Sequence, residues 1–328
     1  MSPRLKFIAG FVLIVLFARA SVVAAQFAVT SNSVLVLSTR EAAGRALATE
    51  DDFIRALSEF DRASRTKSEE ISRAEFLKFV AGEVLAWTES DTTRLERAAA
   101  GAKEKLTPFT LPLPHEILLV KTTGREEANT AYCRGTNVIV LSPRFLSASA
   151  EELESTLIHE LFHIFSRNNP GLREKIYALI GFKPCGEIKL PAELEARHIT
   201  NPDAPRLDFC IDVKRRGQIV SVVPVLFATP AHWTKAKGGE FFAYFTYKLM
   251  ALEHTEAGWR TAENDGRPVL LGLQEVTGLR EQVGVQPGPV LQAEEISAEY
   301  FERMVEGHGT VPPPVRDGMR RLLSRSKP

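Results

Sequence analysis

The segment from residue 149 to residue 167 constrains the fold most, because it predicts a long helix that is apolar over most of its circumference. Ser149-Ala-Glu-Glu152 has the spacing of a capping box, which marks a helix start. Apolar side chains then recur on two sides of the helix, at Leu153, Leu157, Ile158, Leu161, Phe162 and Phe165. Such a helix has to be buried, so we expect the domain to be built around it, with a second helix running from Pro170 to about Gly181.

Inside this helix lies the pattern His159-Glu160-Leu-Phe-His163. Two histidines four residues apart share one face of a helix, so both imidazoles can reach one zinc ion. Glu160 lies about 100° further round the helix from His159, beside the metal rather than on it. This position suits a general base that acts on a zinc-bound water. The pattern therefore predicts a zinc site with His159 and His163 as ligands and Glu160 as the base.

These residues resemble the zincin metallopeptidases, whose fold places an H-E-x-x-H helix beside a small sheet. The resemblance implies an α+β fold in which strands before residue 150 flank the cleft. Ser166 and Asn169 stand where a metzincin has Gly and His, which excludes that branch. An aspartate-ligand variant is not visible either, since Gly309-Thr310 runs into Val-Pro-Pro.

The gluzincin branch takes a third ligand from a later helix, often in the pattern E-x-x-A-D, and Glu295-Ile-Ser-Ala-Glu299 resembles it. The resemblance implies Glu295 as the third zinc ligand and Glu299 as the acid that supports a bound histidine. The long separation from His163 requires a β-rich insertion, and an acidic stripe at this spacing is also typical of a solvated helix face. Alternative third ligands therefore stay open, namely Glu294, Glu187, Glu193 and Glu195.

Zincin sites often contain a side chain that stabilises the oxyanion formed when water attacks a carbonyl. Our candidate for this role is Tyr244, ahead of Tyr247, His232 and His198. For each of them an ordinary structural role is the alternative interpretation. The same holds for the turn-rich run from Asn201 to Pro205, which is either a rigid series of turns or a border of the cleft.

The rest of the chain divides into segments by pattern. We expect a single zincin-like domain over 26–328. It begins with a helical part over 26–106, with two or three amphipathic helices between Ser38 and Lys105. Strands and the active-site helix follow over 107–182, then a β-rich insertion over 183–290, and finally a ligand helix and tail over 291–328. Short strands are predicted at 116–120 and 137–141, a hairpin at 209–214 and 218–227, a strand at 240–252, and the ligand helix at 294–306.

The first 25 residues are typical of a secretory signal peptide. Arg4 and Lys6 precede the apolar run from Phe7 to Ala18, and small residues follow, which predicts cleavage after Ala20 or after Ala25. An uncleaved membrane anchor is the alternative, although Arg19 interrupts the run short of a full span. We therefore expect a periplasmic or extracellular protein. Cys133, Cys185 and Cys210 allow one disulfide at most, and we expect Cys185 and Cys210 to form it if the protein is exported.

Basic and acidic side chains both number 41, so no basic surplus exists to bind the phosphates of a nucleic acid. The sequence predicts a Zn²⁺-dependent hydrolase, most simply a peptidase that acts on a peptide or protein. A zincin-shaped binding or structural protein with a non-catalytic zinc is the alternative. Hydrolysis of a non-peptide amide or ester also agrees with the same motif.

Overall fold

The computed structural model describes residues 25–284 and 291–324, and it contains both helices and sheets, as an α+β fold requires. The mixed fold class predicted from the sequence is therefore confirmed. The predicted signal segment, apart from Ala25, and the Gly- and Pro-containing stretch 285–290 lie outside the described residues. None of the helices in the described ranges has the length and apolar character to cross a membrane.

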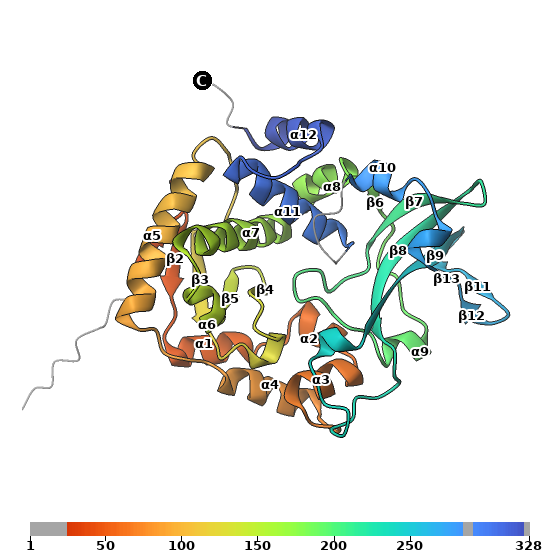
Figure 1. Cartoon of the computed structure of the whole chain (residues 1–328), viewed down its shortest axis with the longest axis horizontal. Helices are drawn as coiled ribbons and strands as arrows, with labels where there is room; N and C mark the ends of the chain where they lie inside the picture. Colours follow the sequence, from red (N-terminus) through yellow and green to blue (C-terminus); the bar gives the residue numbers. More distant parts are fainter. Residues whose placement is uncertain (1–24, 285–290, 325–328) are drawn as a thin grey trace, which may run out of the picture.

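A five-stranded mixed sheet forms one layer of the molecule (Figure 1). Its strands, in spatial order, are β1 Gln26–Ala28, β2 Val34–Leu37, β3 Glu116–Lys121, β5 Val138–Leu141 and β4 Tyr132–Arg134. The three central strands are parallel, and β1 and β4 pair antiparallel at the two edges. Strands β3 and β5 confirm the two short strands expected from the sequence. The edge strands are only three residues long, which is too short for an alternating pattern to be seen.

The N-terminal part contains more helices than the two or three that we expected. Between residues 40 and 106 the helices are α1 Arg40–Leu47, α2 Asp52–Ala56, α3 Glu59–Thr66, α4 Arg73–Gly82 and α5 Glu89–Leu106. Each begins after a Thr, Asp or Ser whose side chain accepts a hydrogen bond from a backbone N–H of the first turn. These caps divide one long apolar pattern into five helices. Helices α1, α2 and α4 cover one face of the sheet.

Helix α7, Ala150–Asn168, lies on the other face of the sheet and packs against α5 and α11 (Figure 1). The helix predicted from residue 150 to 167 is thus confirmed, and the Ser149 side chain accepts from the Glu152 N–H as a cap. Around it are α6 Pro143–Leu146, α8 Pro170–Ala178, α11 Ala293–Glu306 and α12 Pro313–Leu323. Helix α12 was not expected. Lys105 on α5 bridges Glu154 on α7 and Glu306 on α11, which ties these three helices together.

A second, antiparallel sheet is formed by the chain between α8 and α11, where a β-rich insertion was expected (Figure 1). Its strands are β6 Phe182–Pro184, β7 Phe209–Arg215, β8 Gln218–Ala228, β9 Phe245–Thr255, β10 Gly258–Thr261 and β13 Leu270–Leu271. Short elements accompany it: α9 Ala192–Glu195, the strand pair β11 Glu263–Asn264 and β12 Arg267–Pro268, and α10 Leu279–Val283. Strands β7 and β8 confirm the hairpin expected from the sequence, and its turn contains Arg216 and Gly217, both with positive φ. The strand expected from residue 240 instead begins at Phe245, after a 3-10 turn over Phe241–Ala243.

Cys185 and Cys210 lie together in the core beneath this second sheet, and their thiols are within hydrogen-bonding reach of one another. Both are free thiols in the structure. The third cysteine, Cys133, is on β4 in the first sheet. A disulfide between Cys185 and Cys210 stays a prediction.

Candidate metal centre

Helices α7 and α11 bring His159, His163 and Glu295 together. The Glu295 Oε2 atom is 3.7 Å from His159 Nε2 and 4.0 Å from His163 Nε2. One ligand atom of each residue lies within 4.8 Å of the other two. Ligand atoms about 2.1 Å from a tetrahedral zinc ion are about 3.4 Å apart, so three donors at these separations face a space of the right size. Two imidazoles and one carboxylate are also the donor set of a catalytic zinc site.

The other nitrogen of each imidazole faces a different carboxylate of α11. His159 Nδ1 is 3.1 Å from Glu302 Oε2, and His163 Nδ1 is 2.7 Å from Glu294 Oε1. An ionised carboxylate can only accept a hydrogen bond, so each Nδ1 carries the proton. The Nε2 atom of each imidazole is then the one that faces Glu295 and that could bind a metal ion. Protein metal sites use this arrangement to fix the tautomer and orientation of histidine ligands.

Glu294 is the most completely enclosed of these acids. Its side chain is 5% exposed, and the Ser166 and Tyr177 hydroxyls donate to its second oxygen. Sequence reasoning kept Glu294 as an alternative third ligand, whereas the structure places it behind His163, on the Nδ1 side. In the sequence, Ser166 only excludes the metzincin branch, and no pattern points to Tyr177. Their partner lies far along the chain, so spacing within α7 and α8 gave no signal for this contact.

Glu299, the expected support for a histidine ligand, is placed differently from the expectation. Its carboxylate is 2.7 Å from the Arg303 guanidinium. It lies near His159, because one oxygen each of Glu299 and Glu302 is within 4.8 Å of a His159 nitrogen. The hydrogen bond to His159, however, comes from Glu302, three residues further along. The acidic stripe of α11 therefore faces α7 rather than solvent alone.

The charges around the histidines favour a cation. Burial by itself would lower the pKa of His163, but Asp203 and Glu294 outweigh burial and raise this pKa to about 9. The pKa of His159 is likewise raised, against the effect of burial, by Glu295 and Glu302. Burial would raise the pKa of Glu295, yet the two histidines and Asn201 lower it to about 2. The carboxylates around the two imidazoles thus stabilise positive charge at this place, which a divalent cation would also require.

Glu160 points from α7 towards the edge strand β4. Its side chain is 3% exposed, and the Cys133 thiol donates to its Oε2 at 3.1 Å. Burial and the negative Glu160 raise the pKa of Cys133, so the thiol stays protonated and acts as a donor. Glu160 is therefore held beside the histidines by a side chain that sequence reasoning did not connect with the site.

The turn-rich run from Asn201 to Pro205 borders this centre. The Asn201 amide donates to Glu295 Oε1 at 2.6 Å and to Gln292 Oε1 at 2.9 Å. Asp203 Oδ1 accepts from the Cys133 N–H at 2.9 Å and is 3.2 Å from the Arg167 guanidinium. Burial, together with Glu160, raises the pKa of Asp203 to about 7, against the lowering effect of His163 and Arg167. We call residues 199–204 the strap.

The structure does not bring Tyr244 to the histidines through any contact in the described ranges. Its hydroxyl donates to the Gly238 carbonyl and its ring packs on Phe60, with ring centroids 5.6 Å apart. Of the other candidates for the oxyanion role, Tyr247 lies on strand β9. His198 is buried next to Thr200, and His232 is exposed. The distant alternative ligands Glu187, Glu193 and Glu195 are exposed as well.

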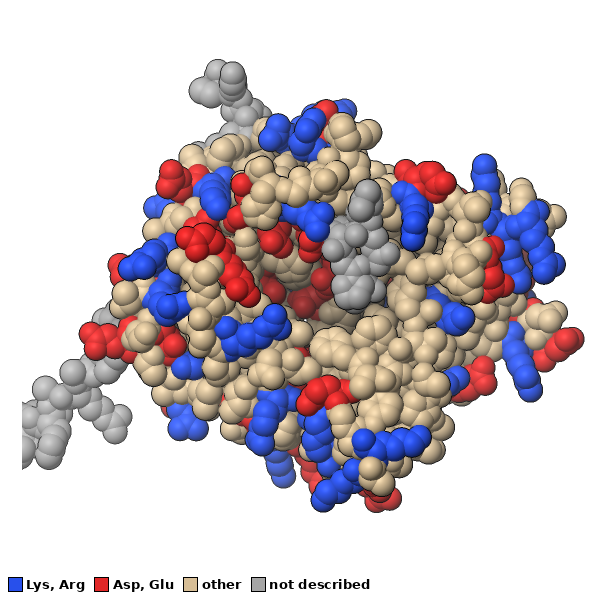
Figure 2. Space-filling model, viewed as in Figure 1, with Lys and Arg blue, Asp and Glu red and all other residues tan. Residues whose placement is uncertain are grey.

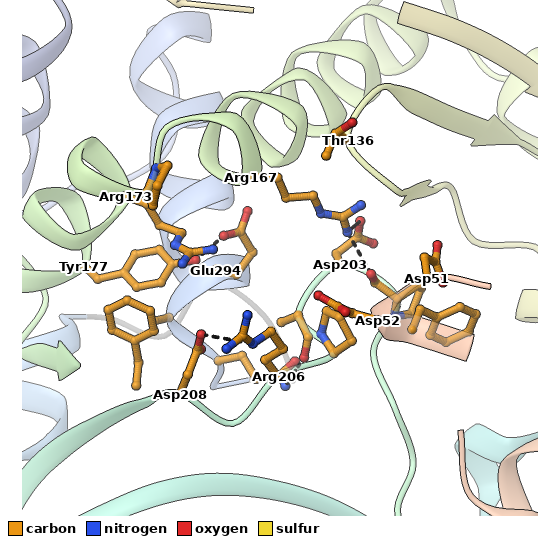
Figure 3. Close-up of a pocket in the computed structure, with 18 of the residues that line it drawn as sticks. Asp51, Asp52, Thr136, Arg167, Arg173, Tyr177, Asp203, Arg206, Asp208 and Glu294 are labelled. Carbon is orange, nitrogen blue, oxygen red and sulfur yellow. Dashed lines mark hydrogen bonds and ion pairs between the residues drawn. The ribbon is translucent and has the colours of Figure 1, made fainter. Parts of the chain in front are cut away.

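The face shown in Figure 2 is hollowed beside the C-terminal half of α7, and acidic side chains form the floor of the hollow. A separate cavity of about 480 Å³ adjoins Glu294 and Asp203. Arg167, Arg173 and Tyr177 also line it (Figure 3). None of His159, Glu160, His163 and Glu295 is among its lining residues, so we do not assign this cavity as the place of the chemistry.

Comparison of the chain with protein-family models, with curated proteins and with solved structures finds no match.

Proposed function

We propose that this protein is a zinc-dependent hydrolase of the gluzincin type and that its substrates are peptides. The observation that carries the proposal is the convergence of His159, His163 and Glu295 from two helices, with Glu160 buried beside them. The placement of α7 against a five-stranded mixed sheet supports a zincin-like fold. The signal-like first segment supports an exported protein.

Each residue has a defined task in this proposal. His159, His163 and Glu295 would hold the metal, and Glu294 and Glu302 keep the two Nδ1 atoms protonated, so that both Nε2 lone pairs face the metal. A bound zinc ion would lower the pKa of water and polarise a substrate carbonyl. Glu160 takes a proton from the attacking water and passes it to the leaving nitrogen. The Cys133 thiol occupies Oε2 of Glu160, so we assign Oε1 to the water.

The test of this function is the variant Glu160→Gln, assayed with a mixed peptide library after zinc content has been measured. We expect it to keep stoichiometric zinc, because Glu160 is not a ligand, and to lose about 10²–10⁴-fold in rate with the general base. Hydrolysis as fast as in the wild type would show that Glu160 is not the base.

A chelator separates catalysis from a purely structural zinc. A catalytic metal predicts that hydrolysis is lost on chelation and regained on adding zinc. A metal that only braces the fold predicts a lower melting temperature and no hydrolysis to lose. Turnover of amide or ester probes without turnover of peptides would keep the hydrolase and change its substrate class.

A further inference from the structure

The edge strand β4 runs next to α7, where an extended polypeptide could add to the sheet. In an antiparallel pair the backbone N–H and C=O of alternate residues point to the same side. The Cys133 N–H donates to Asp203 rather than to β5, so the outward-facing positions are Cys133 and its neighbours two residues away. A sheet edge whose outward backbone groups have no neighbouring strand can bind a peptide as an added strand.

On the Gly135 side this edge is already filled by the protein itself. The Gly135 N–H donates to Asp51 Oδ2 at 3.2 Å, and Arg167 donates to the Gly135 carbonyl at 2.9 Å. Asp203 occupies the outward N–H of Cys133. Three side chains from α7, the strap and the cap of α2 thus take up the outward N–H of Cys133 and both the N–H and the carbonyl of Gly135, so a substrate strand cannot pair with these groups.

The strap that closes this edge is fixed on both sides. Its backbone is held by Ile199 N–H to the Leu226 carbonyl at 2.9 Å and by Thr200 N–H to Asp61 Oδ2 at 2.9 Å. Arg167 donates to the Pro202 carbonyl at 2.7 Å. Asp203 is 8% exposed. Because these contacts are satisfied and buried, the strap is a wall of the site rather than a segment that moves aside.

The contacts that close this edge of the sheet begin at Glu160 and Glu295. Cys133, whose backbone Asp203 holds, is the residue whose thiol contacts Glu160. Asn201, two residues before Asp203, donates to Glu295. The strap therefore runs from the third candidate ligand to the strand beside the base, so it occupies this side of Glu160.

We propose that the enzyme hydrolyses bonds at or next to the end of a peptide chain and does not cut within an extended polypeptide. This inference rests on the proposed peptidase function. Asp203 is then a specificity-determining residue, because it fills the position that the continuing chain of an internal substrate would need.

The test uses the zinc-loaded wild type and one randomised decapeptide library in three forms: both ends blocked, amino end blocked, and carboxyl end blocked. Products are identified by mass spectrometry, with Glu160→Gln as the blank. We expect products shortened by one or two residues from a free end, and turnover of the doubly blocked library at least about 100-fold slower. Internal cleavage of the doubly blocked library within a few-fold of the others overturns the inference while the peptidase function stands. No cleavage of any library by the zinc-loaded protein overturns the peptidase function and this inference with it.

Asp203→Ala gives a second measurement, with Asp203→Asn as its matched control. The asparagine keeps an Oδ1 acceptor for the Cys133 N–H, whereas alanine leaves that edge open. We expect internal cleavage to appear in the alanine variant and not in the asparagine variant. Equal absence of internal cleavage in both folded, zinc-loaded variants contradicts the role of Asp203. If the alanine variant does not fold, the three-library comparison on the wild type decides alone.

Discussion

Helix α7 supplies two imidazoles and a carboxylate to the candidate centre from little more than one turn, whereas α11 supplies three carboxylates spread over more than two turns. On α7 the distance between His159 and His163 is set by the helix itself, and their ring centroids are 4.8 Å apart. On α11 the acids Glu294, Glu295 and Glu302 reach the histidines from different directions.

This difference assigns different work to the two helices. Helix α7 provides two of the three candidate donor atoms and the base, so it defines the chemistry of the centre. Helix α11 provides one donor and two acceptors, so it decides how the histidines are oriented and how much negative charge surrounds the metal. Substitutions on α7 should therefore abolish zinc binding or hydrolysis, while most substitutions on α11 should only change the zinc affinity.

The largest effect is expected from His163→Ala, which removes one of the α7 donors. The imidazole is 1% exposed and has no substitute within its helix. We expect zinc affinity to fall by more than the 10–100-fold typical of a supporting residue, that is, by more than about 100-fold. Competition with a chromogenic chelator measures the affinity. Unchanged zinc stoichiometry in this variant would falsify the site itself.

On α11, Glu294→Gln and Glu299→Gln form a matched pair. Both remove one negative charge from the same helix, but only Glu294 accepts from a candidate ligand. We expect zinc affinity to fall about 10–100-fold in Glu294→Gln and to change less than about 3-fold in Glu299→Gln. The melting temperature of each metal-free variant separates lost folding from lost metal binding. Equal losses in the pair would contradict the assignment of Glu294 and restore a role for Glu299.

The same comparison explains how far the sequence could predict this centre. The face shared by His159 and His163 depends only on helical geometry, so it was visible in the sequence. The pairing of each α11 acid with one imidazole depends on the angle at which α7 and α11 cross. Side-chain packing sets that angle, for example the contact of Phe162 with Phe301, whose ring centroids are 5.4 Å apart. A stripe of acids at helical spacing holds no information about that crossing.

Two further parts of the centre were hidden for other physical reasons. Cys133 lies on a three-residue edge strand, too short for a periodic signal, and its link to Glu160 exists only once β4 and α7 are packed together. The run from Asn201 to Pro205 reads as turns because its contacts are made by single side chains to distant partners. Helix α7, the strands β3 and β5 and the β7–β8 hairpin followed more closely from periodicity, cap and turn residues.

Glu302→Gln tests the contact between α11 and His159, which is less buried than the contact between Glu294 and His163. Glu302 is 21% exposed where Glu294 is 5% exposed, so solvent screens its interaction with His159 more strongly. We expect a loss of up to about 10-fold in zinc affinity, the lower end of the range for such supporting residues. Titration with a competing chelator under the same conditions as for Glu294→Gln measures the difference. If Glu302→Gln loses more zinc affinity than Glu294→Gln, burial does not decide which of the two carboxylates contributes more.

The smallest expected effect comes from Asn201, which acts on the α11 donor from outside both helices. Its amide donates to Glu295 Oε1, which leaves Oε2 directed at the two Nε2 atoms. Asn201→Ala removes one hydrogen bond to a charged group, and we expect zinc affinity to fall about 3–10-fold. Asn201→Asp should lose more than Asn201→Ala, because it sets a second carboxylate against Glu295. A purely structural Asn201 predicts the reverse order, with the similar-sized aspartate tolerated better than alanine, so the ranking of the two zinc affinities decides whether Asn201 positions the ligand.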